Sequence, residues 1–310
     1  EDRFSTVVLT PESAELLLKS TQPQKIKGQD SVLNFYPEQR PVTDSFHINL
    51  KIGTDGIVRV SEMPLPQTDG VSYLIVWQMP GMTRIAQIPQ SLDRDDIFVI
   101  ISDTSGLSIS RNIATAAASA DICMIADDDT VLLPDAFKDI KKTFASDKAL
   151  DIALFRIKGK RKTYPSEHTR LHRKMPHGYW VTSSEITFRT SSIKGQIQFR
   201  EKFGLGSPRF TAAEEAFFIS DALCRGLSVA IVPIEICAQP QLSSGERPFT
   251  SDGGFPASQG AYIRHIHGII YGIPHIFMLA LRARRTHKAP FLFTLKHAFQ
   301  GFTCKTTEML

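Results

Sequence analysis

Three apolar runs of strand length constrain the fold most: VSYLIVWQ (71–78), DIFVIISD (96–103) and ICMIA (122–126). Runs that are apolar along their whole length are typical of parallel strands that helices cover on both faces. Between the last two runs, the alanine-rich SISRNIATAAASA (108–120) predicts a helix, with Ser108 or Ser110 as its N-cap. The sequence therefore predicts an α/β fold with a mostly parallel, Rossmann-like sheet flanked by helices.

The alternation of strands and helices extends to both sides of this region. Before it, we expect a strand over 4–10 and a helix from Pro11. Residues 21–70 are interpreted as a β-rich insertion, with short strands at SVLNFY (31–36), FHINLK (46–51) and GIVRV (56–60). Later elements are a helix over 133–145, strands over 151–157, 183–190 and 227–234, and a helix over 212–226 that Gly226 ends. We expect one domain over 1–250 and a separate helical segment over 251–310.

Length and cysteine content limit the class of protein. With 310 residues, of which 42% are hydrophobic, the chain can bury a sizeable core. Its four cysteines are widely spaced and form no CxxC pair, which argues against a disulfide framework or a structural zinc site. No charged and apolar leader opens the sequence at Glu1, so we expect a cytoplasmic location.

Positive charge is concentrated at the C-terminal end. Between Gly253 and Lys305 there is no Asp or Glu, whereas seven Lys and Arg residues lie there. The apolar run at 268–281 is interrupted by Gly and Pro and is shorter than the ~20 residues that a spanning helix needs. We expect amphipathic helices that contact an anionic membrane surface through 262–302. A core-packed helix pair is the alternative, and weak aromatic–basic interleaving argues against nucleic acid.

Three consecutive carboxylates, Asp127, Asp128 and Asp129, follow the apolar run that ends at Ala126. Ligands bind at the carboxyl edge of open parallel sheets, and clustered carboxylates there suit a hard divalent cation. A solvated turn is the alternative, and for the nearby Asp135 helix capping is favoured. Other metal–phosphate motifs are missing: GKRKT (159–163) lacks the P-loop spacing, and Val131 stands where a DxDxT phosphatase needs Thr.

Blocks of sequence around these residues resemble family 2 glycosyltransferases of the GT-A fold, of the bacterial surface-polysaccharide type. The blocks are YLIVWQ (73–78), GLSISRNIATAAASADICMIADDDTVLLPDAF (106–137), SSEITFR (183–189), FGLGSPRFTAAEEAFFISDALCRGLSVAIVP (203–233) and QPQLSSGE (239–246). The resemblance implies a metal-dependent, inverting transfer of a sugar from a nucleotide-sugar donor, with a UDP-sugar expected. The expected acceptor is a glycan or a lipid-linked molecule at the inner face of a bacterial membrane.

The resemblance also implies roles for single residues on the donor side. Asp127 and Asp129 correspond to the DxD pair that holds Mn²⁺ or Mg²⁺ on the donor diphosphate, and Asp128 faces the ribose or a metal-bound water. The nucleotide is expected to contact four further positions: Thr10, Gln78, Asp103 and Arg111.

Two adjacent glutamates are implied as the catalytic groups. Glu215 matches the usual base of inverting members, and Glu214 orients the acceptor or shares that role. A carboxylate within hydrogen-bond reach of an acceptor hydroxyl can take its proton, and the start of a helix favours the ionised form. Taken without the resemblance, both are ordinary acids of a first helical turn.

The sequence departs from the family pattern at two positions near the site. Ala213 replaces a Gly before the two glutamates, and Gln239 replaces a His that often completes the metal ligands. We expect Gln239 to offer a carbonyl oxygen to the metal and to retain it more weakly.

On the acceptor side we place Trp180 and Glu185. Trp180 is expected to stack on a sugar, with a core tryptophan as the alternative. Two other functions stay open at this level: a sugar-1-phosphate nucleotidyltransferase, and a catalytically degenerate scaffold of the same fold.

Overall fold

The computed structural model describes residues 56–80, 88–159, 162–176, 179–239 and 253–304, and the strands at 7–9, 26–28, 31–33 and 46–52. Thr10 and the predicted helix from Pro11 lie outside the described residues.

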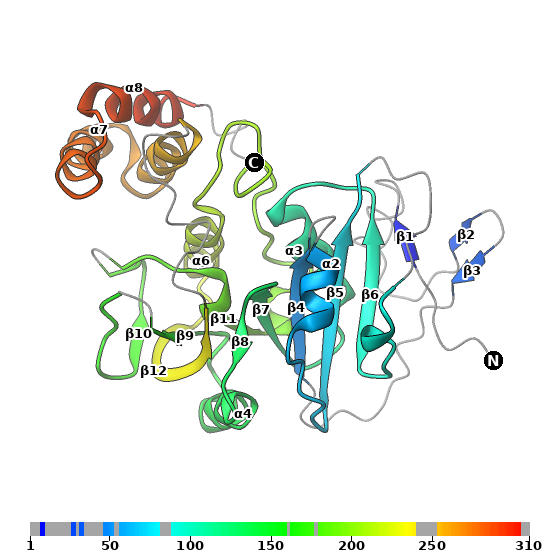
Figure 1. Ribbon diagram of the computed structural model, residues 1–310. Helices are drawn as coiled ribbons and strands as arrows, with labels where there is room; N and C mark the ends of the chain where they lie inside the picture. The colour runs from blue at the N-terminus through cyan, green and yellow to red at the C-terminus, as the bar shows by residue number, and fades with distance from the viewer. Residues whose placement is uncertain are drawn as a thin grey trace.

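A large mixed sheet forms the centre of the molecule (Figure 1). Its strands, in spatial order, are β1 (Val7–Leu9), β6 (Ile97–Ser102), β5 (Val71–Gln78), β4 (Phe46–Ile52), β7 (Ile122–Asp127), β11 (Ile186–Arg189), β9 (Ile152–Lys158), β12 (Val229–Ala238) and β10 (Thr169–Leu171). The first five are parallel, and β11 runs antiparallel to both β7 and β9. The short β8 (Val131–Leu132) pairs with β12, and β2 (Ile26–Gly28) pairs with β3 (Ser31–Leu33) in a separate sheet.

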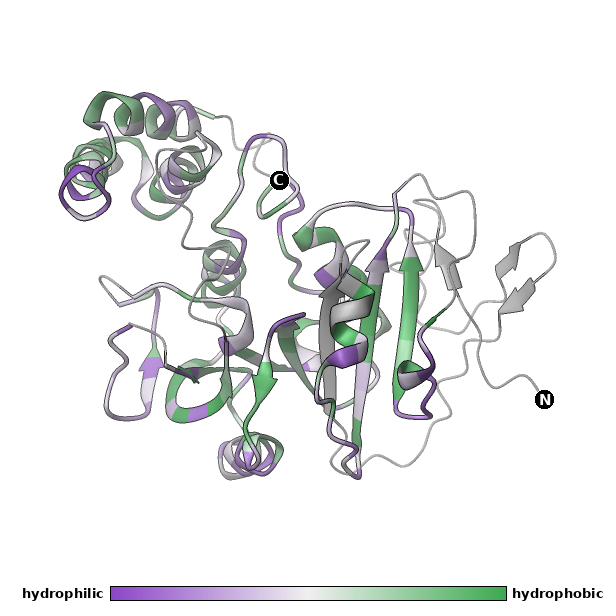
Figure 2. Ribbon diagram, in the orientation of Figure 1, coloured by the Kyte–Doolittle hydropathy of each residue, from purple (hydrophilic) through white to green (hydrophobic). Residues whose placement is uncertain are grey.

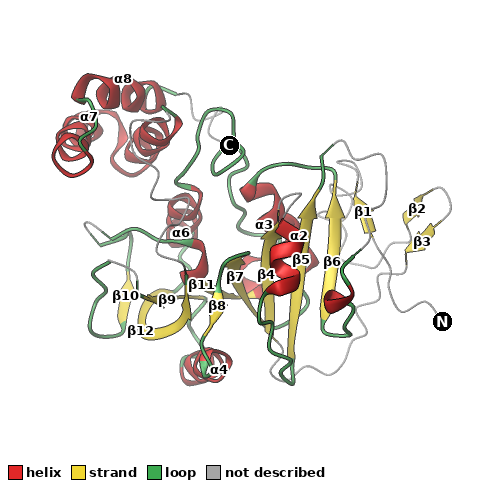
Figure 3. Ribbon diagram, in the orientation of Figure 1, coloured by secondary structure: helices red, strands yellow, loops and turns green. Residues whose placement is uncertain are grey.

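Helices lie on both sides of the strands (Figure 3). The described helices are α2 (Gly56–Glu62), α3 (Leu107–Ala117), α4 (Ala136–Ser146), α5 (Thr190–Ile193), α6 (Glu214–Cys224), α7 (Gly254–His287) and α8 (Phe291–Phe302), of which α7 and α8 lie away from the sheet, and there are 3-10 turns η1 (Gln90–Leu92) and η2 (Ser183–Glu185). Ile75 of β5 shares a buried cluster with Ile140 of α4, and Ile125 of β7 shares another with Phe218 of α6. The predicted double coverage of an α/β sheet is confirmed.

The prediction for residues 46–60 was wrong in two respects. β4 is not part of a hairpin insertion, because it lies inside the main sheet between β5 and β7. GIVRV is not a strand, because it lies in α2, where Ile57 and Val60 are both buried. These two residues are three positions apart and therefore share one face of a helix, so tertiary burial overrides the preference of β-branched residues for strands.

The start of α3 differs from the predicted serine cap. Gly106 occupies the N-cap position, and neither Ser108 nor Ser110 caps the helix. The Ser108 hydroxyl donates instead to the carbonyl of Phe203 at 2.7 Å, and the Leu107 N–H donates to the carbonyl of Leu205 at 2.9 Å. The loop before α6 therefore supplies the acceptor for this helix start, and it brings α3 and α6 together.

The C-terminal segment forms two helices, and α8 packs along α7 on both sides of Gly268. A Cβ atom built on Gly260 would lie 1.9 Å from the Ala298 carbonyl oxygen, and one on Gly301 would lie 1.8 Å from that of Ala257. Only glycine fits at these two contacts, so the pair is a specific packing of helix on helix.

Candidate active site

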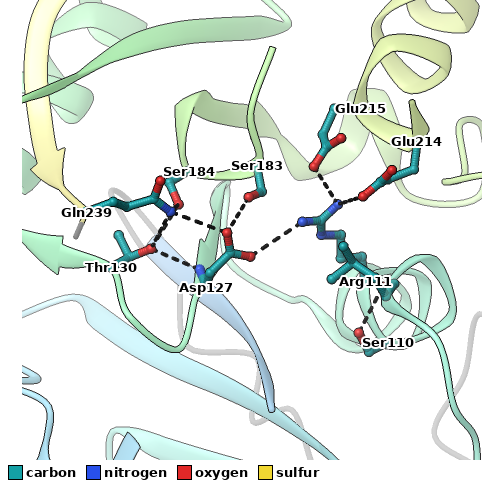
Figure 4. Close-up of polar contacts among 10 residues, drawn as sticks. Ser110, Arg111, Asp127, Thr130, Ser183, Ser184, Glu214, Glu215 and Gln239 are labelled. Atoms are coloured by element: carbon teal, nitrogen blue, oxygen red, sulfur yellow. Dashed lines mark hydrogen bonds and ion pairs between the residues drawn. The ribbon is translucent and has the colours of Figure 1, made fainter. Parts of the chain in front are cut away.

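Asp127 lies at the carboxyl end of β7, an inner strand of the sheet, as predicted. Its Oδ2 accepts a hydrogen bond from the Ser183 hydroxyl at 2.6 Å and one from the Gln239 amide nitrogen at 3.3 Å (Figure 4). Its Oδ1 lies 3.4 Å from the Arg111 guanidinium. Three donors from distant parts of the chain therefore fix the orientation of this carboxylate.

A network of hydroxyl and amide groups surrounds Asp127. The Thr130 and Ser184 hydroxyls are 2.8 Å apart, and the Gln239 amide nitrogen lies 2.8 Å from the Ser184 hydroxyl. The Asp127 N–H donates to the Thr130 hydroxyl at 3.0 Å. The turn after β7, η2 and the end of β12 are thus joined at one point. Asp128 and Asp129 are half-buried in that turn.

Arg111 joins the aspartate side of the site to the glutamate side (Figure 4). Its guanidinium, only 3% exposed, lies 3.0 Å from Glu215 and 3.5 Å from Glu214, in addition to Asp127. Burial opposes the charged form, but the carboxylates of Glu215, Asp127 and Glu214 outweigh it and raise the pKa of Arg111. Sequence reasoning placed Arg111 at the nucleotide; its contact with both glutamates was not foreseen.

The two glutamates differ in their access to solvent. The Glu214 side chain is 6% exposed and that of Glu215 is 15% exposed. Burial, followed by repulsion from Glu215, raises the pKa of Glu214 to about 8, although Arg111 opposes the shift. Burial therefore favours the protonated form of Glu214, whereas Glu215 faces the more open side of the pair.

The backbone before α6 shows why glycine would be favoured at the position that Ala213 occupies. Ala213 has φ 74° and ψ 6°, in the left-handed region that favours glycine. Glu214 and Glu215 follow this turn directly, and alanine adopts the conformation here at a cost of roughly 1–2 kcal/mol.

The predicted nucleotide-contacting residues lie at neighbouring strand ends. Gln78, at the end of β5, is buried, and its amide nitrogen donates to the Gly106 carbonyl at 3.0 Å. Asp103 follows β6 directly and is exposed. Both are on the carboxyl edge of the parallel strands, and their contact with a nucleotide stays a prediction. The same applies to Thr10, which lies outside the described residues.

The acceptor-side residues have contrasting environments. Trp180 is 52% exposed, so the alternative of a core tryptophan is wrong. Glu185 is fully buried: both its oxygens lie 2.7 Å from the Lys162 ammonium, and the Tyr164 hydroxyl donates to it at 2.6 Å. Glu185 is therefore held by internal partners, and its contact with an acceptor stays a prediction.

The chemistry of the donor set fits a hard divalent cation in part. Asp127 and Asp129 offer carboxylate oxygens two residues apart at a strand end, as Mg²⁺ or Mn²⁺ requires when phosphates supply further ligands. Gln239 turns its amide nitrogen, a donor, toward Asp127. Among the described residues, no group of three or more His, Cys, Asp or Glu side chains is placed to hold a metal ion.

The fold and the site define an α/β protein of the GT-A type. An inner strand ends in aspartates, and these face a pair of glutamates across Arg111. The family model of glycosyl transferase family 2 matches residues 83–208, a range that includes Arg111 and the three aspartates. Over these residues the chain is therefore similar to a family 2 glycosyltransferase domain. No curated protein sequence matches it.

Solved structures agree on the fold. S. aureus TarS 1–349 is 13% identical with a TM-score of 0.51, and the alignment covers 83% of this chain and 70% of that one. The same TarS segment in complex with UDP-GlcNAc is 14% identical with a TM-score of 0.50, covering 83% and 71%. Its complex with UDP is 13% identical with a TM-score of 0.50, covering 83% and 70%. At this identity the likeness shows the GT-A fold alone.

Proposed function

We propose that this glycosyltransferase moves a sugar from a UDP-sugar to a hydroxyl of a glycan or lipid-linked acceptor, with inversion, in the synthesis of a cell-surface polysaccharide. The observation that carries the proposal is the placement of Asp127 and Glu215 on opposite sides of the Arg111 guanidinium. The bound UDP and UDP-GlcNAc of the TarS structures support a UDP-sugar as the donor.

Asp127 and Asp129 would hold Mn²⁺ or Mg²⁺ against the donor diphosphate. A divalent cation bound there supplies electrostatic stabilisation of the leaving diphosphate. Arg111 adds a permanent positive charge at the same edge of the site, and Ser183 and Gln239 keep the Asp127 carboxylate in one orientation. Arg111, Ser183 and Gln239 donate hydrogen bonds to Asp127 and so compete with a cation for its oxygens. We therefore expect the free chain to bind the cation weakly and the donor diphosphate to supply the remaining ligands.

Glu215 is proposed as the base that takes the proton of the acceptor hydroxyl. A base must be ionised and must be reachable by the acceptor, and Glu215 is the more exposed of the two glutamates. Glu214 is less suited to this role, because its side chain is 6% exposed and burial raises its pKa. Its role is to position Arg111 and, through it, Glu215.

On the acceptor side, the exposed ring of Trp180 is proposed as a stacking surface for a sugar. The Lys162 ammonium lies 5.5 Å from its ring centre, and η2, three residues further on, begins with the serine that contacts Asp127. An acceptor on Trp180 would therefore lie beside the donor site.

A panel of UDP-, GDP- and dTDP-sugars tests this function through thermal shift and release of the nucleoside diphosphate. We expect UDP-sugars to raise the melting temperature in the presence of Mn²⁺ or Mg²⁺ and to be hydrolysed slowly. Tight binding without hydrolysis or transfer would favour the degenerate scaffold. Formation of a nucleotide-sugar from a sugar-1-phosphate would favour the nucleotidyltransferase.

A further inference from the structure

We propose that the α7–α8 hairpin carries a docking face for an anionic lipid bilayer, which lies in the membrane interface and does not cross it. This inference concerns the binding surface and holds independently of the donor sugar. The bilayer is the one occupant that both the apolar character and the charge of this face fit.

Exposed apolar side chains gather on this hairpin. The described residues include eleven large hydrophobic side chains classed as exposed, and eight belong to α7 or α8. They are Ile269, Ile270, Tyr271, Ile273, Phe277, Met278, Leu281 and Leu292, which we call the apolar face. Ile270 and Tyr271 are 79% and 75% exposed. An accumulation of large exposed apolar side chains on one helix pair is typical of a binding surface.

The apolar face occupies one side of α7, and the other side is already covered. Ile276 and Ala280 are fully buried, and Ile276 packs in a cluster with Ala298 and Phe302 of α8. Buried and exposed positions alternate at the three- to four-residue spacing of a helix. In Figure 2 the hairpin lies at the edge of the molecule, away from the sheet, and is coloured hydrophobic over much of its length. The exposed side is therefore a second apolar face with no occupant among the described residues.

The charge around this face selects an anionic partner. Neither α7 nor α8 contains an Asp or Glu. Four cationic residues follow Leu281, the last α7 residue of the apolar face, and are exposed: Arg282, Arg284, Arg285 and Lys288. A basic cluster beside inserted apolar side chains is the arrangement that binds anionic lipid headgroups, each cation near the surface adding to the attraction.

The length of the apolar part of α7 indicates that it lies in the membrane interface and does not span the bilayer. α7 is the one helix in the described part of the chain that is long and apolar enough to cross a membrane, with a mean hydropathy of 1.3 over its best window. However, Gly268 has non-helical φ/ψ (68°, −167°) and interrupts the helix, and Arg282 begins the basic cluster. The 13 residues between them rise only about 20 Å, less than the ~30 Å hydrocarbon core. The segment is therefore interfacial.

The same helix joins the docking face to the catalytic glutamates. Before Gly268, Ala257 and Ala261 of α7 pack with Phe217 of α6, and the Ser258 hydroxyl accepts the Ala212 N–H at 3.2 Å. The His265 ring lies 3.4 Å from Asp221, also of α6. Because Glu214 and Glu215 open α6, a docked hairpin holds them at a fixed distance from the lipid surface. If the proposed function is correct, the acceptor is taken from that surface.

Co-sedimentation with phosphatidylcholine vesicles, with and without phosphatidylglycerol, tests the proposal on the full chain. We expect binding to the anionic vesicles, reduced at least about tenfold by the triple change Ile270→Ser, Phe277→Ser and Leu281→Ser. The change Arg282→Gln, Arg284→Gln and Arg285→Gln should give a similar loss and remove the preference for phosphatidylglycerol. Vesicle binding does not depend on the donor, so its failure is distinguishable from failure of the transferase assignment.

Control variants remove one apolar side chain and three cations from other parts of the surface. Phe98→Ser removes an exposed apolar side chain from β6, and Lys138→Gln, Lys142→Gln and Lys148→Gln removes three cations around α4. Both should bind vesicles as the unchanged chain does, and unfolding curves will show that every variant is folded. The proposal is overturned if the unchanged chain stays in the supernatant, or if controls and hairpin variants lose binding equally. It is also overturned if light scattering shows a dimer that the apolar triple change dissociates, because a second copy then covers this face.

Discussion

The Arg111 guanidinium lies 3.0 Å from the Glu215 carboxylate, although 104 residues separate them in the chain. The same guanidinium lies 3.4 Å from Asp127. One buried cation therefore links the group proposed to hold the donor with the group proposed to activate the acceptor. The loop from Phe203 to Leu205 makes this possible, because it accepts hydrogen bonds from the start of α3 just before α6 begins.

Removing the buried cation should destabilise the fold strongly. Arg111→Ala leaves Glu215, Asp127 and Glu214 without their shared partner, and we expect a loss of about 3–5 kcal/mol in the free energy of unfolding. Arg170→Ala is the control, since Arg170 makes a more exposed ion pair with Asp147 and should cost under about 1 kcal/mol. Urea unfolding measures both, and losses of equal size would contradict the linking role of Arg111.

The raised pKa of Glu214 predicts a pH-dependent stability. The folded chain binds this proton more tightly than the unfolded chain does, because the pKa is about 8 instead of the model-peptide value of 4.5. The contribution is fully present below the ordinary pKa and is lost as pH rises toward 8, with a slope of at most about 1.4 kcal/mol per pH unit. Glu214→Gln should reduce the pH dependence of the free energy of unfolding between pH 4.5 and about 8, as measured by urea unfolding at a series of pH values. A slope unchanged by the substitution would show that Glu214 is ionised throughout.

Gln239→His should strengthen metal binding by the free chain. In the structure the Gln239 amide nitrogen donates to Asp127, and the amide oxygen is a weaker ligand than an imidazole nitrogen. Calorimetry with Mn²⁺ in the absence of nucleotide should show weak binding by the unchanged chain, tighter binding by the variant, and tighter binding by both when UDP is added. Tight Mn²⁺ binding by the unchanged chain in the absence of UDP would contradict the proposal that the free chain binds the cation weakly.

The buried ion pair of Lys162 and Glu185 predicts that a second substitution restores stability lost through the first. Lys162→Met leaves the fully buried Glu185 carboxylate without its cation and should cost roughly 3–5 kcal/mol of stability. Adding Glu185→Gln removes the uncompensated charge and should restore most of that loss, because the Tyr164 hydroxyl can still donate to the amide oxygen. Thermal unfolding of the single and double variants measures the recovery. A double variant no more stable than the single would contradict an ion pair as the stabilising contact.

Local sequence predicted much of the fold because strands such as β5, β6 and β7 are apolar along their whole length. It failed at β4 and α2, where pairing partners and the burial of Ile57 and Val60 decide the structure. The strand β7, which ends in aspartates, was predicted from its composition. Contacts that depend on three-dimensional closure were not: Arg111 with Glu215, and Ser183 with Asp127. Ser183 lies in the SSEITFR block, but nothing in that block shows which carboxylate its hydroxyl would reach.

The most direct test of the central claim compares Asp127→Asn with Glu215→Gln in UDP-sugar binding and in metal-dependent release of UDP. If Asp127 holds the donor side and Glu215 acts as the base, Asp127→Asn should weaken donor binding. Glu215→Gln should bind the donor normally and release UDP at least about a hundredfold more slowly. Unchanged UDP release by Glu215→Gln, or unchanged metal-dependent donor binding by Asp127→Asn, would contradict the account.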